Sequence, residues 1–177
     1  MRLWMSVSMA MLLAAPAAAT AAEPLAVTLS TDHALPVSGA IDWNGFYAGV
    51  FGVAQAGDGE AAGFGIGADI GLNARFEFVL VGAEVAIHSR TDGAGAGTYV
   101  QGIGRVGVAV TDDLVIYGAG GAGTDLGPVA ETDALVGGGV EFALTESVSL
   151  RGQYLHGFAV EGDERTEQVT FGANFHF

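Results

Sequence analysis

The chain contains 177 residues, half of them apolar, and carries a formal net charge of −14. Its Lys and Arg together number six, all of them arginine, and it has no cysteine. The charge excludes nucleic acid as an expected partner, because that binding depends on cationic contacts to phosphate. The lack of cysteine excludes disulfides and thiol chemistry, so burial and closure of the fold must supply stability.

Residues 1–22 have the pattern of a secretory signal peptide. Arg2 supplies a positive charge, Val7 to Ala14 is mostly apolar, and an alanine-rich run of small residues follows. Three cleavage positions stay open, after Ala19, Ala21 or Ala22. Residues 23–42 contain two prolines and no sustained period, so we expect a flexible periplasmic linker there.

The hydropathy pattern of residues 43–177 predicts a single domain built of strands. Beyond the signal peptide, no apolar run reaches the about 18 residues that a transmembrane helix needs. The clearest alternation covers the 13 residues from Ala62 to Ala74, with apolar side chains on one face and glycines, Asp69 and Asn73 on the other. A tilted membrane strand needs about 9–11 residues, so this stretch is long enough to cross a membrane and to extend slightly beyond it.

Seven further segments complete the predicted architecture. The expected strands are Trp43–Ala54, Ala62–Ala74, Val79–His88, Thr98–Val110, Leu114–Thr124, Asp133–Leu144, Val148–Phe158 and Glu167–Phe177. Tight turns alternate with longer, Gly- and acid-rich loops such as Ser89–Gly97. Short turns at one end and longer loops at the other are typical of outer-membrane barrels, whose short turns are periplasmic. We therefore expect an all-β, eight-stranded antiparallel up-and-down transmembrane β-barrel in the cell outer membrane.

The closing segment Val169–Phe177 (VTFGANFHF) has one aromatic, apolar face and one polar face. Such a strand at a chain end would leave a sticky edge in a soluble protein. Paired with the first strand, it loses that edge and turns its phenylalanines to lipid. Aromatic residues near the strand ends are expected to form interfacial girdles: Trp43, Phe46, Tyr47, Phe76, Phe78, Tyr99, Tyr117, Tyr154 and Phe158.

Five charged residues are predicted to point into the lumen: Asp69, Glu84, Arg105, Glu141 and Arg151. A turn centred on Glu146 places Glu141 opposite Arg151, and Glu84 and Arg105 sit at similar heights on adjacent strands. We expect the pairs Glu84–Arg105 and Glu141–Arg151 to plug the lumen, because buried charges are costly unless they are paired. Three carboxylates against two guanidiniums leave one negative charge over.

At Asp42–Gly49 (DWNGFYAG) the chain resembles the opening strand of the small alphaproteobacterial outer-membrane β-barrels, the porin-like surface antigens. The resemblance continues through Gly104–Ala109, Gly137–Leu155 and the closing Gly172–Phe177 (GANFHF). It implies an eight-stranded barrel inserted by the barrel-assembly machinery, which reads a C-terminal aromatic signal at Phe171, Phe175 and Phe177. The chain departs from the family at Gln153–His156, where Glu-Tyr-Leu-Tyr is common.

The sequence favours a structural or surface protein with a largely plugged lumen, no cofactor and no catalysis. Its acidic loops suggest outer-membrane lipid and lipopolysaccharide, bridged by divalent cations, as partners. No triad is evident, since His88 and Ser89 point to opposite faces of a strand. A narrow diffusion pore is the alternative, favoured by inward glycines that would leave gaps: Gly63, Gly65, Gly67, Gly71 and Gly82. A hemin-binding surface protein, using His88 or His156 at the extracellular rim, is a further alternative.

Overall fold

A computed structural model describes residues 41–57, 62–92, 95–127, 131–160 and 165–177. They form eight strands: β1 (Gly45–Gly57), β2 (Gly63–Phe76), β3 (Val79–Asp92), β4 (Gly95–Ala109), β5 (Leu114–Asp125), β6 (Thr132–Ala143), β7 (Val148–Ala159) and β8 (Arg165–His176). The expected signal peptide and most of the expected linker lie outside the described residues. Within these ranges, no helix has the length and apolar character needed to cross a membrane.

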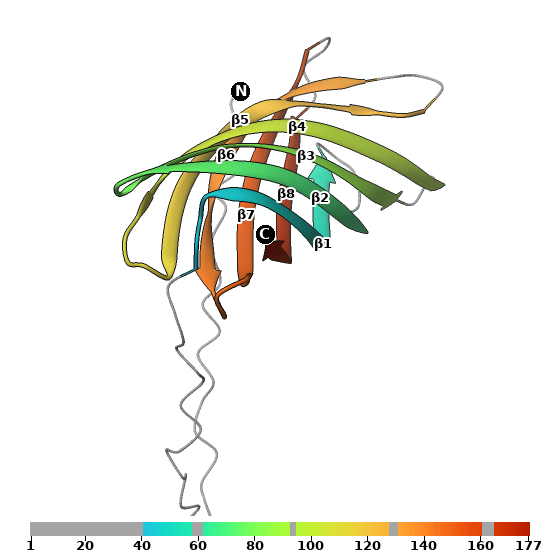
Figure 1. Cartoon of the computed structure of the whole chain (residues 1–177). Coiled ribbons are helices and arrows are strands. Elements are labelled where there is room, and N and C mark those ends of the chain that lie inside the picture. Colours follow the sequence, from blue (N-terminus) through green and yellow to red (C-terminus); the bar gives the residue numbers. More distant parts are fainter. Residues whose placement is uncertain (1–40, 58–61, 93–94, 128–130, 161–164) are drawn as a thin grey trace, which may run out of the picture. The chain divides into compact units, whose positions relative to one another are not determined.

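The eight strands close into one barrel in which every strand pairs antiparallel with its chain neighbours (Figure 1). The closing pair joins β8 to β1, with Val50 opposite Ala173 and Gly52 opposite Phe171. The predicted fold class is therefore confirmed, and so is the placing of the last strand beside the first. Tight turns join β2 to β3, β4 to β5 and β6 to β7 at the end where β1 begins; we call this the turn end and the opposite end the loop end.

The β3–β4 hairpin is longer than the sequence indicated. Ser89–Gly97 was expected to be a loop, but Ser89 pairs with Thr98, Arg90 with Gly97 and Asp92 with Gly95. The expected strand ended at His88, directly after the apolar Ile87, whereas backbone pairing needs no apolar side chain and continues through the polar hairpin. The β3–β4 hairpin therefore extends past the apolar band. At the other end, β1 begins at Gly45 rather than at Trp43.

The outer wall of the barrel is apolar. Bulky side chains alternate outward along β2 and β8, and many are more than half exposed: Phe64, Ile66, Ile70, Phe76, Val169, Phe171, Phe175 and Phe177. The intervening residues of β8, such as Thr170, Asn174 and His176, are buried in the lumen. This distribution is the reverse of a soluble protein's and matches the lipid-facing band of a transmembrane barrel. The predicted faces of the closing strand are confirmed.

Aromatic rings fill the lumen by lying over glycines on neighbouring strands. A Cβ atom added at Gly71 would collide with the ring of Tyr47, and one at Gly123 with the ring of Tyr99. Gly67 gives the same space to Phe51. The inward glycines were expected to leave gaps that favour a pore. The gaps at Gly67 and Gly71 are instead occupied, because a residue without a side chain is what lets a large neighbour fold flat against the wall.

Replacing Gly71 with alanine should lower the free energy of unfolding by about 1–3 kcal/mol, the usual effect of overpacking a core. The new methyl group would displace Tyr47 from its place beside Glu84. Gly102→Ala is the matched control, because an added Cβ there meets nothing within 4 Å. Urea unfolding of the barrel in lipid vesicles checks this. Equal midpoints for the two variants would show that Tyr47 does not occupy the space over Gly71.

Candidate functional site: the charged and aromatic lumen

Two arginines hold three carboxylates inside the barrel. Arg151 Nη2 lies 2.6 Å from Asp69 Oδ2, and Arg151 Nη1 also pairs with Glu84. Arg105 Nη1 lies 2.9 Å from Glu141 Oε2. All five side chains are buried, the most accessible being Glu84 at 6%. The structure thus brings together all five of the charged residues singled out from the sequence.

The partners within this set differ from the expected ones. Glu141 does lie opposite Arg151 in the strand register, but Arg151 pairs across the lumen with Glu84 and Asp69. Arg105 pairs with Glu141, so the expected pairs Glu84–Arg105 and Glu141–Arg151 are wrong. In a narrow closed barrel the inward side chains of all strands share one space. A guanidinium on a long side chain therefore reaches partners beyond its adjacent strand.

Tyrosine rings enclose Arg105. Its guanidinium carbon lies 4.7 Å from the ring centre of Tyr47 and 5.2 Å from that of Tyr117. Its Nε and Nη2 donate hydrogen bonds to Asn73 Oδ1 at 3.0 and 2.9 Å. Cation–π contacts of this kind strengthen when water is excluded. Each nitrogen of the buried guanidinium therefore has a partner, as a buried charge requires.

The same tyrosines tie the two halves of the network together. The Tyr47 hydroxyl donates to Glu84 Oε2 at 2.7 Å, and the Tyr117 hydroxyl donates to Gln153 Oε1 at 2.9 Å. Both were expected in an interfacial girdle, and that assignment is wrong, as it is for the buried Tyr99. Strict alternation would have shown it, because Tyr47 follows the outward Phe46. Of the expected girdle, Phe46, Phe76, Phe78, Tyr154 and Phe158 do face outward.

A second polar cluster surrounds Glu141. Its Oε1 accepts hydrogen bonds from Ser149 Oγ at 2.6 Å and Asn174 Nδ2 at 2.9 Å, and lies 3.3 Å from His176 Nε2. His176 was absent from the predicted charge count. The Glu141 carboxylate therefore contacts side chains from β4, β7 and β8.

Serine, histidine and glutamate side chains meet here without forming a catalytic relay. Ser149 Oγ lies 3.0 Å from His176 Nε2, the same ring nitrogen that faces Glu141. A relay needs one ring nitrogen toward the nucleophile and the other toward the acid. Ser149 and Glu141 are also fully buried.

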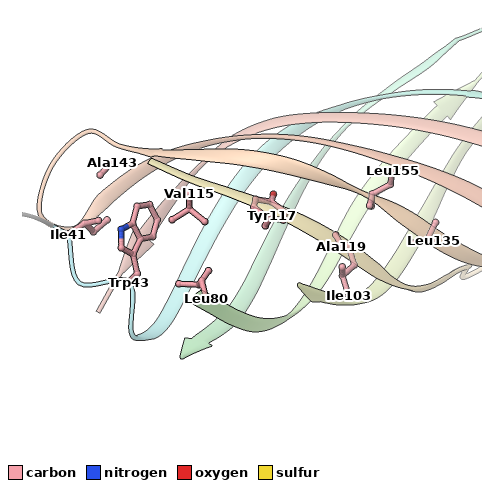
Figure 2. Close-up of a cluster of buried hydrophobic side chains, with 10 residues drawn as sticks. All are labelled: Ile41, Trp43, Leu80, Ile103, Val115, Tyr117, Ala119, Leu135, Ala143 and Leu155. Atoms are coloured by element: carbon pink, nitrogen blue, oxygen red, sulfur yellow. The ribbon is translucent and has the colours of Figure 1, made fainter. Parts of the chain in front are cut away.

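The residues just before β1 close the turn end. Trp43 is fully buried and its Nε1 donates to the Asp112 carbonyl, in the β4–β5 turn, at 2.9 Å. Ile41, from the expected linker, is 2% exposed beside it. Figure 2 shows Ile41 and Trp43 at one end of a buried apolar cluster whose other end holds Leu135 and Leu155. The expectation of Trp43 in a lipid-facing girdle is therefore wrong.

Hydrogen bonds of Asp42 and Asn44 hold the segment that closes the turn end in place. Asp42 Oδ1 accepts hydrogen bonds from the backbone N–H and side chain of Asn44 at 2.9 and 3.0 Å, which lowers the pKa of Asp42. Asn44 Oδ1 in turn accepts the backbone N–H of Arg75, near the end of β2, at 2.7 Å. The short segment before β1 is thereby attached to a second strand hairpin and directs Trp43 into the lumen.

Side-chain bridges narrow the loop end. Arg90 Nη1 lies 3.2 Å from Asp125 Oδ2. The Tyr99 hydroxyl donates to Asp133 Oδ2 at 2.8 Å. These contacts join β3 to β5 and β4 to β6, so each spans one intervening strand on the inside of the barrel.

The two candidate heme ligands do not share a site. His88 was expected at the rim but is 2% exposed in the lumen, with its ring centre 5.2 Å from that of Tyr99. His156 points outward from β7, and its Nδ1 lies 2.7 Å from Glu167 Oε1, which pairs it with β8. Among the residues placed by the structure, no three His, Asp, Glu or Cys side chains are grouped to hold a metal ion.

No family model and no curated protein sequence matches the chain. Among solved structures, it is similar to the attachment invasion locus protein Ail of Yersinia pestis, with 16% identity and a TM-score of 0.56 over 75% of this chain and 96% of that one. It is similar to Neisserial surface protein A, with 12% identity and a TM-score of 0.55 over 75% and 97%. The N-terminal β-barrel domain of Pseudomonas aeruginosa OprF gives 14% identity and 0.51 over 73% and 97%. At these identities the likeness shows the fold, that of small transmembrane β-barrels.

Proposed function

We propose that this chain is a structural or surface protein of the cell outer membrane, without catalytic activity, whose lumen is closed to solutes. The observation that carries the proposal is the paired filling of the lumen, in which Arg151 binds Glu84 and Asp69 while Arg105 binds Glu141. A diffusion pore needs a continuous water path, and an eight-stranded barrel has an interior only just wide enough for side chains.

Three barriers in series support the closed lumen. The Trp43 side chain stands at the turn end, the arginine–carboxylate network fills the middle, and the Tyr99–Asp133 bridge crosses near the loop end. The pore alternative depended on gaps at inward glycines. Tyr47 and Phe51 occupy two of those gaps, at Gly71 and Gly67, which argues against a continuous water path. Of the two histidines on which the hemin alternative depended, His88 is buried and His156 is paired with Glu167.

The outer wall supports the proposed membrane and partners. Its apolar band fits outer-membrane lipid and lipopolysaccharide. The outward Phe171 and Phe175, with Phe177 after β8, fit an aromatic signal for the barrel-assembly machinery. The Phe177 N–H also donates to the Phe46 carbonyl at 3.0 Å, so the last residue takes part in closing the barrel. We further propose membership of the alphaproteobacterial porin-like surface antigens, on the motifs given above.

Planar-bilayer recording tests the closed lumen. We expect the inserted barrel to give no stable conductance steps, and heat-modifiable gel mobility of the same sample provides the control that folded barrel was present. Stable, cation-selective steps from wild-type protein would overturn the proposal. In that case Glu141→Ala should alter the conductance, which separates current through this lumen from leakage around it.

A further inference from the structure

Three ionisable side chains interrupt the apolar outer wall of the barrel, all at one place. His156 lies on β7, and Arg165 and Glu167 lie on β8 beside it. Alternation turns them outward, because the adjacent Leu155 and Gln168 are buried in the lumen. In the strands that the structure describes, no outward position of β1–β6 holds Asp, Glu, Arg or His. Ionisable residues that face lipid are costly and mark functional sites, so their gathering on two adjacent strands calls for an explanation.

Contacts within this group hold the imidazole of His156 in one orientation. Its Nδ1 lies 2.7 Å from Glu167 Oε1, and the outward Tyr154 donates its hydroxyl to Glu167 Oε2. The Phe158 ring meets the imidazole edge to face, with the ring centres 4.4 Å apart. Because Glu167 contacts Nδ1, Nε2 lies on the opposite side of the ring. Arg165 is opposite Phe158 in the strand register, and we call Tyr154, His156, Arg165 and Glu167 the β7–β8 polar cluster.

The β7–β8 polar cluster lies at the margin of the apolar band, near the loop end. His156 is opposite the exposed Val136 across the β6–β7 pair, and the exposed Val169 is the next outward residue on β8. Beyond His156 the wall continues toward the loop end with the outward Phe158 and Val160. The cluster is therefore bordered by apolar side chains, at the depth where acyl chains meet headgroups. Since the short turns of such barrels are periplasmic, this depth belongs to the outer leaflet.

The cluster offers both donors and acceptors to a lipid. The Arg165 guanidinium only donates and matches the geometry of a phosphate, while the Glu167 carboxylate only accepts. A carboxylate accepts at about four sites, and the contacts with Tyr154 and His156 leave room for further donors. A simple anionic phospholipid presents phosphate and ester oxygens, which satisfy the arginine but repel the carboxylate. A lipid whose phosphate lies near amide and hydroxyl groups satisfies both.

We propose that the β7–β8 polar cluster is a binding site for the headgroup of lipopolysaccharide, whose lipid-linked sugars carry phosphate, amide and hydroxyl groups. Arg165 binds a phosphate, His156 Nε2 faces the same headgroup, and Glu167 accepts from an amide or a hydroxyl. Tyr154 and Phe158 lie beside the upper part of the acyl chains, as aromatic residues do at membrane interfaces. This inference rests on the outer-membrane location proposed above and adds to it one defined site on the wall.

Competition between two lipids, measured by native mass spectrometry of the folded mature barrel in detergent, tests the site. Equimolar lipid A, the membrane-embedded part of lipopolysaccharide, and phosphatidylglycerol separate a phosphorylated sugar headgroup from a phosphate alone. We expect wild type to retain lipid A in preference to phosphatidylglycerol. Arg165→Met should lower that preference roughly 2- to 12-fold, the range for one net hydrogen bond. Equal retention of the two lipids by wild type would overturn the proposal.

Arg75→Met is the matched control, because Arg75 is also a partly exposed arginine but lies at the turn end. We expect it to leave the lipid preference unchanged. Equal losses in the two arginine variants would mean that lipid A responds to net charge, and would refute the site. Heat-modifiable gel mobility in phosphatidylcholine vesicles shows whether each sample is folded. A folded barrel without a preference for lipid A refutes this inference alone, whereas a chain that forms no barrel in any lipid contradicts the proposed membrane protein.

His156→Phe separates a lipid site from a contact that only joins β7 to β8. The change keeps an outward ring against Phe158 but removes both ring nitrogens. In the lipid site, adding lipid A to phosphatidylcholine vesicles stabilises wild type against urea, because a ligand that binds the folded state shifts the unfolding equilibrium. His156→Phe should reduce that shift roughly 2- to 12-fold. If the variant instead lost the same stability with and without lipid A, the cluster would be a strand contact only and the proposal would be wrong.

Discussion

Arg151→Met should lower the free energy of unfolding by about 3–5 kcal/mol, the cost of breaking a buried ion pair on one side. The methionine fills much of the same volume but leaves Glu84 and Asp69 as neighbouring buried carboxylates without their shared cation. Trp43 fluorescence during urea unfolding measures the effect, because the chain has two tryptophans and the other, Trp4, lies in the expected signal peptide.

Arg75→Met is the matched control for that experiment. Arg75 Nη2 is 3.8 Å from Asp112 Oδ1, and the two side chains are 26% and 77% exposed. Exposed pairs of this kind contribute about 0–1 kcal/mol. A triple variant, Arg151→Met with Glu84→Gln and Asp69→Asn, should recover part of the loss because it removes the unpaired charges. Equal effects of Arg151→Met and Arg75→Met would show that Arg151 is not the buried centre of the network.

The faces of the strands were predictable because alternation is a local property. The inward position of Glu141 and Arg151, and their register across the β6–β7 turn, follow from a period of two and a short turn. The pairing of the charges was not predictable in this way. It depends on how far a guanidinium reaches across the lumen and on which oxygens remain after Tyr47 and Ser149 have donated their hydrogen bonds.

The three tyrosines were misassigned because a general expectation about aromatic residues was preferred to the alternation along each strand. Aromatic residues near strand ends commonly form membrane girdles, and Tyr47, Tyr99 and Tyr117 were assigned on that basis. Their parity places them on the inner face, where Gly71, Gly123 and Gly139 leave space for their rings. The glycine positions and the tyrosine positions are thus one pattern. Its two halves lie on different strands, so the match becomes visible only once the strand register is known.

The strand ends and the turn-end seal were least accessible from sequence. The β3–β4 hairpin continues through polar residues, where hydropathy gives no signal. Trp43 has the inward parity of Tyr47 and Phe51, but it lies before β1 begins at Gly45, so strand pairing does not fix its direction. Its orientation is set by the hydrogen bonds of Asp42 and Asn44 and by the Asp112 carbonyl, which is distant in sequence.

Trp43→Ala should lower the free energy of unfolding by about 3–5 kcal/mol, as expected for truncating a large buried aromatic residue. The change empties the turn end beside Ile41 and Val115 and removes the hydrogen bond to Asp112. Trp43→Phe keeps much of the apolar contact and should lose only about 0.5–1.5 kcal/mol through the hydrogen bond. Heat-modifiable gel mobility across a urea series measures both variants without needing the tryptophan.

Leu126→Ala is the control for this series, because Leu126 is 60% exposed at the loop end and its truncation should change stability by no more than about 0.5 kcal/mol. We expect the loss of stability to be largest for Trp43→Ala, smaller for Trp43→Phe and smallest for Leu126→Ala. The difference between the two Trp43 variants separates the contribution of packing from that of the hydrogen bond. If Trp43→Ala had no larger effect than Leu126→Ala, the segment before β1 would not be packed into the barrel. The arginine network would then be the principal barrier in the turn-end half of the lumen, since the seal in front of it would be lost at little cost.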